Sequence, residues 1–477
     1  MIDETCGVYI DGNWRSTAEE ISVRHFEDET FDKSKHTYPS HYTAADNDDV
    51  KEAVRVASSA ADGLTIVERA NMLEELAELV QENKQYLTEC IIKEAGKPIS
   101  SARGEVEATI ERFNRAVEEV RALNGTYQEG TTSSHEDWQS IVKPVPLGAI
   151  GVISPYNYPL LTTVLQVAPA LAAGNGVVIK PSSKTPGPSV ILAELFDTTE
   201  FPSSLLNVVV GDGETIGTAL AQSDIDMVAL TGSTTAGQTV ASNTSVTRLQ
   251  MELGGNAPAL VFPDADTDEA ASECVAGSLK YGGQRCSAVS RIIAHEKIVD
   301  ELVENIMREV KTNNWGLCGL YNENTKMAPL IDETQAEWVG TLIDDAVEKG
   351  ASVELGGERH NEFFEPTVLT NVPHNARIIT EEQFGPVVVI TNAETEQEMM
   401  KLANGGELTL DASLFTNNHS RIMRCSDKIN AGTVRVNGAP SHGLGDVPFG
   451  GMNKSGIGRQ GLHVTIENML TTKSIIL

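Results

Sequence analysis

A series of short apolar runs, separated by stretches of helical length, most constrains how this chain can fold. The runs are GAIGVIS (148–154), NGVVIKP (175–181), LNVVVG (206–211), MVALTG (227–232) and PALVF (258–262). Strands that are apolar along their whole length and alternate with helices are typical of a parallel sheet covered on both faces. Nucleotides bind such sheets at the carboxyl ends of the strands. The pattern therefore predicts an α/β protein with a Rossmann-like domain.

The rest of the chain extends this α/β pattern. Residues 50–122 carry apolar side chains at three- and four-residue spacing, which predicts helices, and a second α/β series follows from about 265 to 437. The polar segment 124–146 predicts a protruding hairpin, and the final KSIIL predicts a strand that needs a partner. We expect a cofactor-binding domain, a catalytic α/β domain and an oligomerisation arm, with the respective boundaries 1–123 and 147–254, 255–449, and 124–146 with 450–477.

The charge balance narrows the choice of partners. The chain has 68 acidic and 36 basic residues, a net charge of -32, spread along its length. Such a field repels phosphate backbones and anionic lipid, so we expect neither nucleic-acid nor membrane binding. Diffuse acidic charge also suits concentrated salt, where self-repulsion is screened. We therefore expect a halophilic host, with an acidic mesophilic enzyme as the alternative.

Two further features bear on location. The uncharged stretch 144–179 has the length of a membrane span, but Pro155, Pro159, Pro169 and Asn175 interrupt it, so two strands and a buried helix explain it better. The six cysteines are scattered, without C-x-x-C spacing or a secretory signal, which indicates free thiols in a reducing cytoplasm. We expect no metal site.

Two segments contain candidate catalytic residues. In GGQRCSAVS, Cys286 follows a cation, Arg285, and precedes a hydroxyl residue, Ser287. A neighbouring positive charge lowers a thiol pKa, as a nucleophile requires, although a buried structural cysteine is the alternative. In MELGGNAP, Glu252 lies among apolar neighbours before a Gly-Gly turn. Burial would raise its pKa towards that of a general base, and a pairing glutamate at a strand end is the alternative.

Other segments suit ligand binding. Prolines on both sides of Asn157 in PYNYP would pre-position an amide donor for an oxyanion, unless NYP is only a turn. In LTGSTTAG, Gly232 and Ser233 would lie at a helix N-terminus, where phosphate binds. In ITEEQFGPV, Glu381 and Glu382 precede an aromatic-Gly-Pro turn, and a carboxylate there could hold ribose hydroxyls. GDGETIG (211–217) is expected to be a loop near the cofactor.

Taken in order, seven motifs resemble one family. PYNYP, IKPSS, LTGS, MELGGN, GQRC, EEQFGP and PFGGMNKSG are similar to the motifs of the NAD(P)-dependent aldehyde dehydrogenase superfamily, from about residue 45 to 477. The chain most resembles the branch that holds the non-phosphorylating glyceraldehyde-3-phosphate and lactaldehyde dehydrogenases. The resemblance implies a Rossmann-like cofactor domain, an α/β catalytic domain and an arm that makes dimers or tetramers.

The resemblance also implies roles for residues. Cys286 would attack the aldehyde to give a thiohemiacetal, with the Asn157 amide and the Cys286 backbone N–H as the oxyanion hole. After hydride transfer Glu252 would activate the water that hydrolyses the thioester. The set of cofactor residues would hold two riboses and a pyrophosphate, and its members are Lys180, Ser183, Gly232, Ser233, Glu382 and Phe384.

The cofactor preference follows from IKPSSK. NAD-specific members of the family tend to carry a glutamate where this chain has Ser183, so no carboxylate would repel a 2′-phosphate, and Lys184 could attract one. We therefore expect NADP as the preferred cofactor and NAD as the second.

The substrate is less constrained. Tyr158 and Arg285 match phosphate-binding members of the family, and Ser287 would also contact the substrate. Two further arginines of those members fall on Ala108 and His442, with Arg112 one helical turn from the first. A small aldehyde of the lactaldehyde, succinic semialdehyde or glyceraldehyde 3-phosphate class remains expected. The alternatives are a CoA-acylating enzyme, which typically lacks the base glutamate, and a non-catalytic binding protein on the same fold.

Overall fold

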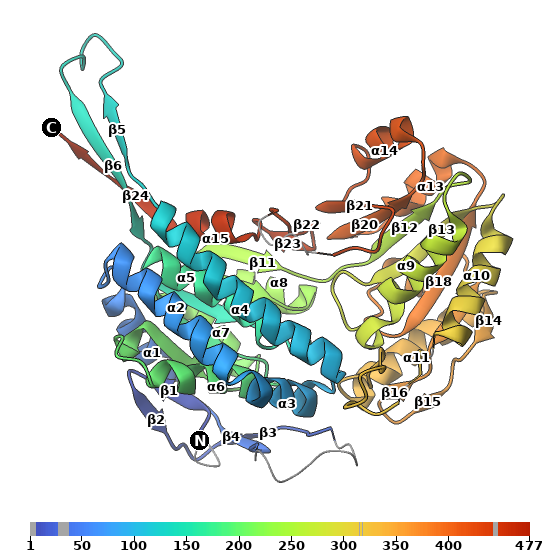
Figure 1. Ribbon diagram of the computed structural model, residues 1–477, viewed down its shortest axis with the longest axis horizontal. Helices are drawn as coiled ribbons and strands as arrows, with labels where there is room; N and C mark the ends of the chain where they lie inside the picture. The colour runs from blue at the N-terminus through green and yellow to red at the C-terminus, as the bar shows by residue number, and fades with distance from the viewer. Residues whose placement is uncertain (1–5, 27–37, 314, 317, 442–446) are drawn as a thin grey trace.

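Alternate residues of the central strands face two different helical layers. In the computed structural model, which describes residues 6–26, 38–313, 315–316, 318–441 and 447–477, Val177 and Ile179 pack into one hydrophobic core and Val178 into another. Continuous apolar strands are therefore required, because both faces of the sheet are covered. Figure 1 shows two such α/β bodies next to each other, with a hairpin projecting from the first.

The first sheet has eight strands, and its five central strands are parallel. Its strands in spatial order are β2 (Asn13–Arg15), β1 (Val8–Ile10), β9 (Leu206–Val209), β8 (Gly176–Lys180), β7 (Ala149–Ile153), β10 (Met227–Thr231), β11 (Arg248–Glu252) and β23 (Gly456–Ile457). In register, Ile153 pairs with Lys180, and Thr231 pairs with Glu252. The carboxyl ends of these strands therefore present Lys180 and Glu252 along one edge.

Helices cover both faces of this sheet. One face packs against α1 (Asn47–Ala60), α7 (Thr215–Gln222) and α8 (Thr234–Asn243). The other packs against a larger layer, made of α2 (Ile66–Glu82), α3 (Lys84–Ala95), α4 (Ile99–Ala122), α5 (Leu161–Ala173), α6 (Gly187–Asp197) and α15 (Leu462–Asn468). The predicted helices of 50–122 are thus confirmed as α1 to α4. The uncharged stretch becomes β7, α5 and β8. Among the described residues, no helix combines the length and apolarity needed to cross a membrane.

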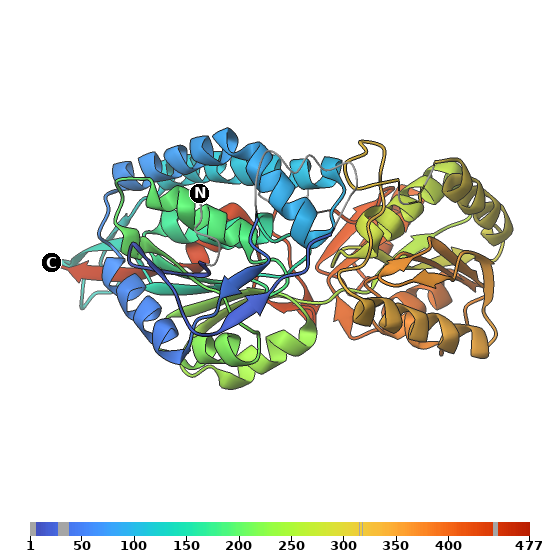
Figure 2. The same cartoon turned by 90° about the horizontal axis from the view of Figure 1, so that it is seen from below.

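The second sheet has seven strands. In spatial order they are β14 (Ser352–Leu355), β17 (Thr367–Thr370), β18 (Val387–Ala393), β13 (Val289–His295), β12 (Ala257–Val261), β20 (Asp411–Phe415) and β21 (Thr433–Val436). Its helices are α9 (Thr267–Leu279), α10 (Val299–Thr312), α11 (Glu333–Glu348), α12 (Arg377–Thr380), α13 (Glu396–Ala403) and α14 (His419–Ser426). Figure 2 shows the two bodies in line. Residues 253–256 connect β11 of the first sheet directly to β12 of the second.

The predicted hairpin forms a three-stranded sheet with the C-terminus. Its strands are β5 (Thr126–Glu129), β6 (Gln139–Pro146) and β24 (Leu470–Ile476), and β24 pairs with residues 140–146 of β6. The segment from residue 450 thus serves two sheets, because β23 pairs with β11 before α15 and β24 follow.

Short elements complete the fold. They are the pairs β3 (Glu20–Ser22) with β4 (His41–Thr43), β15 (Arg359–His360) with β16 (Phe363–Phe364) and β19 (Leu408–Thr409) with β22 (Met452–Asn453), and the 3-10 turns η1 (Ser203–Leu205) and η2 (Lys280–Gly283). All six cysteines are free thiols.

Candidate active site

One cavity gathers all twelve residues that we expected, from the sequence, to be catalytic, cofactor-binding or substrate-binding. Its volume is about 1020 Å³, and it is lined by strand ends of the first sheet, by the segment after η2 and by the turn before β18. The nominated residues on its wall are Asn157, Tyr158, Lys180, Ser183, Gly232, Ser233, Glu252, Arg285, Cys286, Ser287, Glu382 and Phe384. They come from segments far apart in the sequence, so their convergence is a property of the fold.

The backbone before Cys286 takes an unusual path. Tyr281, Gly282 and Gly283 all have positive φ, at 58°, 65° and 70°. A Cβ on Gly283 would lie 2.1 Å from the Gly385 carbonyl oxygen, so only glycine fits there. This left-handed turn directs the chain from α9 to Cys286 and then into β13.

Cys286 and Glu252 lie next to each other. The Cys286 Sγ is 3.6 Å from the Glu252 Oε1, and the thiol is placed to donate to that oxygen. Ser287 Oγ is 3.7 Å from the same sulfur. Glu252 is buried, as the last residue of β11. A carboxylate at this distance can accept the thiol proton, which is what activation of a cysteine requires.

The thiol pKa runs against the sequence-based expectation. Burial, and then the charges of Glu252 and Asp411, raise the pKa of Cys286 well above its ordinary value, and the hydrogen bond with Ser287 lowers it only in part. The Arg285 guanidinium that we expected to lower this pKa donates through Nη2 to the Gly277 carbonyl at 2.5 Å. The thiol is therefore protonated at neutral pH and depends on a base.

The Asn157 loop is tied to the cysteine segment. Asn157 is buried in the turn after β7, and its Nδ2 donates to the Gln284 carbonyl at 2.8 Å. A side-chain amide has two N–H donors, so one is left for an oxygen in the cavity. The proximity agrees with the expected position of an oxyanion donor.

A buried ion pair beneath this loop was not foreseen from the sequence. Lys97 and Glu105 are fully buried, with 2.6 Å between Nζ and Oε2. Glu105 Oε1 accepts from the backbone N–H groups of Leu160 and Leu161, at 3.0 and 3.1 Å, which anchors the start of α5. Only their spacing of eight residues near the start of α4 could have hinted at the pair.

At the other end of the cavity, polar groups suit a dinucleotide. Lys180 Nζ is buried and, among the described residues, donates only to the Pro181 carbonyl at 3.1 Å, which leaves further N–H donors for a ligand. Burial lowers the pKa of Lys180 to about 8. Ser233 caps the N-terminus of α8, where the helix dipole favours phosphate. Gly213 of the GDGETIG loop also lines the cavity, as expected.

Glu382 and Phe384 close this end. Glu382 Oε1 accepts from the Gly255 N–H at 2.8 Å, and burial raises the pKa of Glu382 to about 7. Phe384 has a φ of 46°, and its ring meets that of Tyr156 edge-on, with centroids 6.0 Å apart. A buried ammonium, a helix N-terminus and a carboxylate together fit the hydroxyls and phosphates of a dinucleotide.

One expected cofactor contact is absent. Ser183 lines the cavity, but Lys184 does not, because its ammonium forms an ion pair with Asp332. Asp332 is the N-cap of α11, so the pair connects the two α/β bodies. Within the described residues, Ser183 and not Lys184 is therefore placed to meet a 2′-phosphate.

The cavity wall carries several cations. Besides Tyr158, Arg285 and Ser287, the wall includes Arg112 and Lys280. Other lining residues were not expected from the sequence to bind a ligand, among them Glu111, Arg115, Tyr156, Gln335 and Trp338. His442 lies outside the described residues. The stripe of α4 at three- and four-residue spacing was the signal that could have placed Arg115 beside Arg112.

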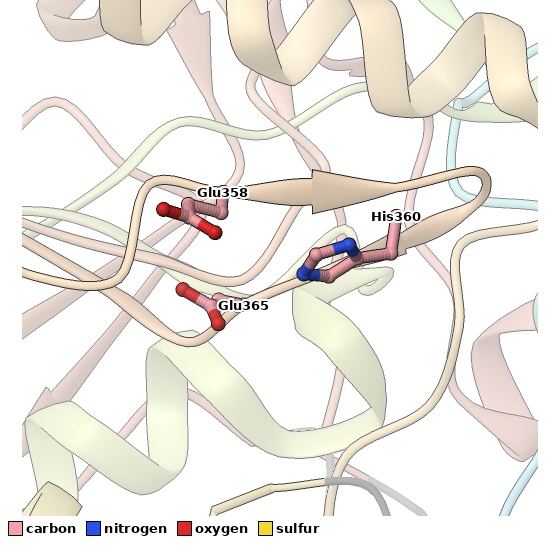
Figure 3. Close-up of side chains that lie close together, drawn as sticks. All are labelled: Glu358, His360 and Glu365. Carbon is pink, nitrogen blue, oxygen red and sulfur yellow. The ribbon is translucent and has the colours of Figure 1, made fainter.

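A group of potential metal ligands lies away from this cavity. Glu358, His360 and Glu365, on the β15–β16 hairpin, have ligand atoms within 4.8 Å of one another (Figure 3). None of the three lines the cavity. The glutamates face each other at a hydrated surface, where screening makes such proximity tolerable without an ion.

Comparisons with known proteins agree with this geometry. The sequence pattern described as "Aldehyde dehydrogenase family" matches residues 24–475. A 3-sulfolactaldehyde dehydrogenase of Priestia aryabhattai is 34% identical over 99% of this chain and 98% of its own. An NADP-dependent glyceraldehyde-3-phosphate dehydrogenase of Streptococcus equinus is 34% identical over 98% of each. Among solved structures, the NADP-dependent glyceraldehyde-3-phosphate dehydrogenase of Bacillus halodurans C-125, complexed with NADP, matches with a TM-score of 0.94 and 32% identity over 99% of each chain.

Proposed function

The chain belongs to the aldehyde dehydrogenase family, and from this premise we propose that it oxidises a small aldehyde to the carboxylic acid through a thiohemiacetal and a thioester on Cys286. Members of the family are NAD(P)-dependent oxidoreductases, and the fold, an α/β protein with parallel sheets, is that of its solved relatives. The observation that carries the proposal is the 3.6 Å separation of the Cys286 Sγ and the Glu252 Oε1.

The first half of the reaction uses Glu252 as a base. Glu252 takes the thiol proton, the Cys286 sulfur bonds to the aldehyde carbon, and the carbonyl electron pair moves to oxygen. The free N–H of the Asn157 amide and the backbone N–H of Cys286 stabilise that oxyanion. Bound NAD(P)+ would supply the acceptor for the hydride that leaves the carbon. The carbonyl re-forms as a thioester.

The second half releases the acid. After Glu252 has passed its first proton to solvent, it takes a proton from a water that attacks the thioester carbon. The carbon–sulfur bond then breaks, and the sulfur regains a proton. The presence of Glu252 supports water over CoA as the acyl acceptor.

The test is NADPH formation across a panel of small aldehydes, without and with CoA. The panel contains glyceraldehyde 3-phosphate, lactaldehyde and succinic semialdehyde. We expect turnover without CoA that Cys286→Ala abolishes, and an acyl adduct on Cys286, located by peptide mass spectrometry, in wild-type protein quenched during turnover. Turnover only with CoA would favour the acylating alternative. Cofactor binding without any turnover or adduct would favour the alternative of a non-catalytic binding protein.

We also propose NADP as the preferred cofactor and NAD as the second. Ser183 supports this preference, because it places no carboxylate on the cavity wall where a 2′-phosphate would be repelled. The relatives from Streptococcus equinus and Bacillus halodurans are named as NADP-dependent. A kcat/KM for NAD far above that for NADP would overturn the preference.

The arm supports an oligomer. Tyr127, Trp138, Ile141 and Ile476 on and around its strands are exposed, and burying them against a second copy would be favourable. We propose a homodimer or homotetramer, with the remaining chain divided into cofactor and catalytic domains near residue 255. Light scattering on the intact chain tests the oligomeric state.

We also propose a cellular location and a type of host for the enzyme. Six free thiols and an acidic, dispersed charge support a cytoplasmic enzyme of a halophile. A melting temperature that does not rise with molar KCl would count against the halophilic host.

A further inference from the structure

Resting on the proposed function, we propose that the corner between α3 and α4 positions two loops of the cavity wall, with Glu94 and Lys97 as its positioning residues. Glu94 sets the loop between β8 and α6 (181–186), which we call the cofactor loop. Lys97, through Glu105, sets the loop between β7 and α5 (154–160), which we call the Asn157 loop. Glu94 therefore acts on cofactor binding, and Lys97 acts on turnover.

Both loops begin on a strand of the first sheet and end at the start of a helix. The cofactor loop contributes Ser182 and Ser183 to the cavity wall, and the Asn157 loop contributes Asn157 and Tyr158. Each strand fixes one end of its loop within a rigid sheet. The conformation of each loop therefore depends on what holds the N-terminus of the helix that follows it.

Glu94 holds the N-terminus of α6. It is buried near the end of α3, and its Oε2 accepts from the N–H of Gly187, the first residue of α6, at 2.8 Å. The Tyr42 hydroxyl donates to Oε1 at 2.7 Å. A Cβ on Gly187 would lie only 2.6 Å from that Oε1, so the start of the helix packs directly against the carboxyl group. The first N–H groups of a helix have no partner within it, and Glu94 supplies one.

Glu105 holds the N-terminus of α5 in the same manner. Its Oε1 accepts from the backbone N–H groups of Leu160 and Leu161, and its Oε2 pairs with the Lys97 ammonium. A buried carboxylate keeps its charge only while a partner offsets the loss of hydration. Lys97 therefore maintains the charge that holds this helix start.

Lys97 also connects the corner to the turn before Cys286. Its ammonium faces the ring of Tyr158, in the Asn157 loop, and the ring of Tyr281, in that turn. The Tyr281 hydroxyl donates to the Ala95 carbonyl at 3.1 Å, at the end of α3. Attraction between a cation and an aromatic ring is strongest where water is excluded. The corner thus fixes the Asn157 loop and the cysteine turn relative to each other.

The two positioning residues serve different ends of the cavity. Helix α3 packs against α6, and α4 packs against α5 (Figure 1). Loss of the Glu94 carboxyl releases the start of α6 and the serines before it. Loss of the Lys97 ammonium releases the segments that carry Asn157 and Cys286, and a misplacement of about 1 Å between reacting groups can cost about 100-fold in rate.

The experiment compares two matched substitutions. Glu94→Met and Lys97→Met each remove a polar group and keep a side chain of similar length. Glu94→Met should raise the Kd for NADP, measured by calorimetric titration, about 10-fold, because the Gly187 N–H loses its acceptor, with a smaller change in kcat. Lys97→Met should lower kcat for the best aldehyde of the panel about 10- to 100-fold, with a smaller change in this Kd. Two variants that change Kd and kcat in the same proportion would overturn the inference.

Glu94→Gln is the conservative variant. Burial raises the pKa of Glu94 to about 8, so the carboxyl group is mostly protonated at neutral pH, and an amide resembles it closely. The amide oxygen can still accept from the Gly187 N–H. Glu94→Gln should therefore keep most of the NADP affinity that Glu94→Met loses. An equal loss in both variants would mean that this hydrogen bond does not hold the cofactor loop.

Two buried tyrosines give a milder pair of variants that keeps both charges. Tyr42→Phe removes the hydrogen bond to Glu94, and Tyr281→Phe removes the one to the Ala95 carbonyl. They should show the same division between Kd and kcat with smaller changes, and they decide the inference if either methionine variant does not fold. A larger effect of Tyr42→Phe on kcat than on Kd would contradict it.

Tyr9→Phe is the matched control. Tyr9 is buried in β1, donates to Asp197 at 2.7 Å and does not line the cavity. The variant loses a hydrogen bond of the same kind, but it contacts neither loop. It should leave the Kd for NADP and kcat unchanged. A change in either quantity as large as in Tyr42→Phe or Tyr281→Phe would mean that general loss of stability, and not positioning, explains the effects.

Hydrogen exchange separates failure of this inference from failure of the proposed function, because it needs no aldehyde. Peptide mass spectrometry of the full chain should show faster amide exchange in residues 154–161 and 281–286 for Lys97→Met, and in residues 181–190 for Glu94→Met. If no aldehyde is oxidised, the proposed function fails, and this pattern still decides the inference. Exchange that rises equally in all three segments in both variants would overturn it.

Discussion

The ammonium of Lys97 lies 3.4 Å from the centre of the Tyr158 ring. Tyr281 is the second ring that this ammonium faces, at 4.6 Å. Lys97 thus lies between the residue after Asn157 and the turn that leads to Cys286. A cation between two rings, held by Glu105, stabilises both loops in one arrangement.

Removing the charge of Lys97 tests this arrangement. Lys97→Met should lower the free energy of unfolding by about 3–5 kcal/mol, because Glu105 is left as a buried charge without its partner. Urea unfolding measures the loss. The double variant Lys97→Met with Glu105→Gln should regain part of it. If the single and double variants are equally destabilised, the pair does not act as a unit.

Alkylation of Cys286 reports its pKa directly. The charge of Glu252 raises the pKa of the thiol, so Glu252→Gln should increase the thiolate fraction at a given pH and speed the reaction with iodoacetamide. The same variant should lower turnover, because the base is lost. Mass spectrometry of the Cys286 peptide follows the alkylation. Slower alkylation together with slower turnover would mean that Glu252 does not repel the thiolate.

The stability of the protein should depend on pH through Glu382. Burial raises its pKa from 4.5 to about 7, so the folded state holds a proton that the unfolded state has lost over this range. The stabilisation is therefore fully present below about pH 4.5 and is lost as pH rises through 7, by at most about 3 kcal/mol. Glu382→Gln should flatten the difference between unfolding at pH 5 and at pH 8. An unchanged difference would contradict the assignment.

Gly283 should be essential for the shape of the turn before Cys286. Gly283→Ala puts a Cβ 2.1 Å from the Gly385 carbonyl at a φ of 70°, so we expect activity to fall at least tenfold as the cysteine is displaced. Gly217→Ala is the control, since a Cβ there meets nothing within 4 Å. Full activity in Gly283→Ala would show that the turn adapts.

Ser183 provides the test of cofactor choice. Ser183→Glu adds a carboxylate to the cofactor end of the cavity, where it would repel a 2′-phosphate and accept from a 2′-hydroxyl. We expect kcat/KM with NADP to fall about 10- to 100-fold, by the cost of one close like-charge contact, while that with NAD is retained. An equal loss with both cofactors would indicate general damage to the site.

The sequence predicted which residues belong to the site better than it predicted the contacts that their side chains make. Lys180 and Glu252 could be placed because the carboxyl ends of parallel strands meet at one edge, whatever the length of the helices between them. No comparable rule predicts where a long side chain points. Arg285 and Lys184 were expected to act on the thiol and on the cofactor, and they contact the Gly277 carbonyl and Asp332 instead.

The contact between Lys97 and Tyr158 lies beyond sequence reasoning for a different reason. It joins a loop before α4 to a loop before α5, and no periodic pattern specifies how two such loops meet. The sequence also does not distinguish a buried lysine from an exposed lysine. Only the packing of α4 on α5 brings them together.

Helix α4 carries two kinds of residue on one face. Glu105 anchors the start of α5, and Ala108, Arg112 and Arg115 follow at spacings of three and four residues on the wall of the cavity. The earlier turn of this face therefore holds the start of α5, and the later turns present side chains to the cavity. Exchanges in the later turns can therefore give an enzyme new substrates during evolution while its reaction chemistry stays the same.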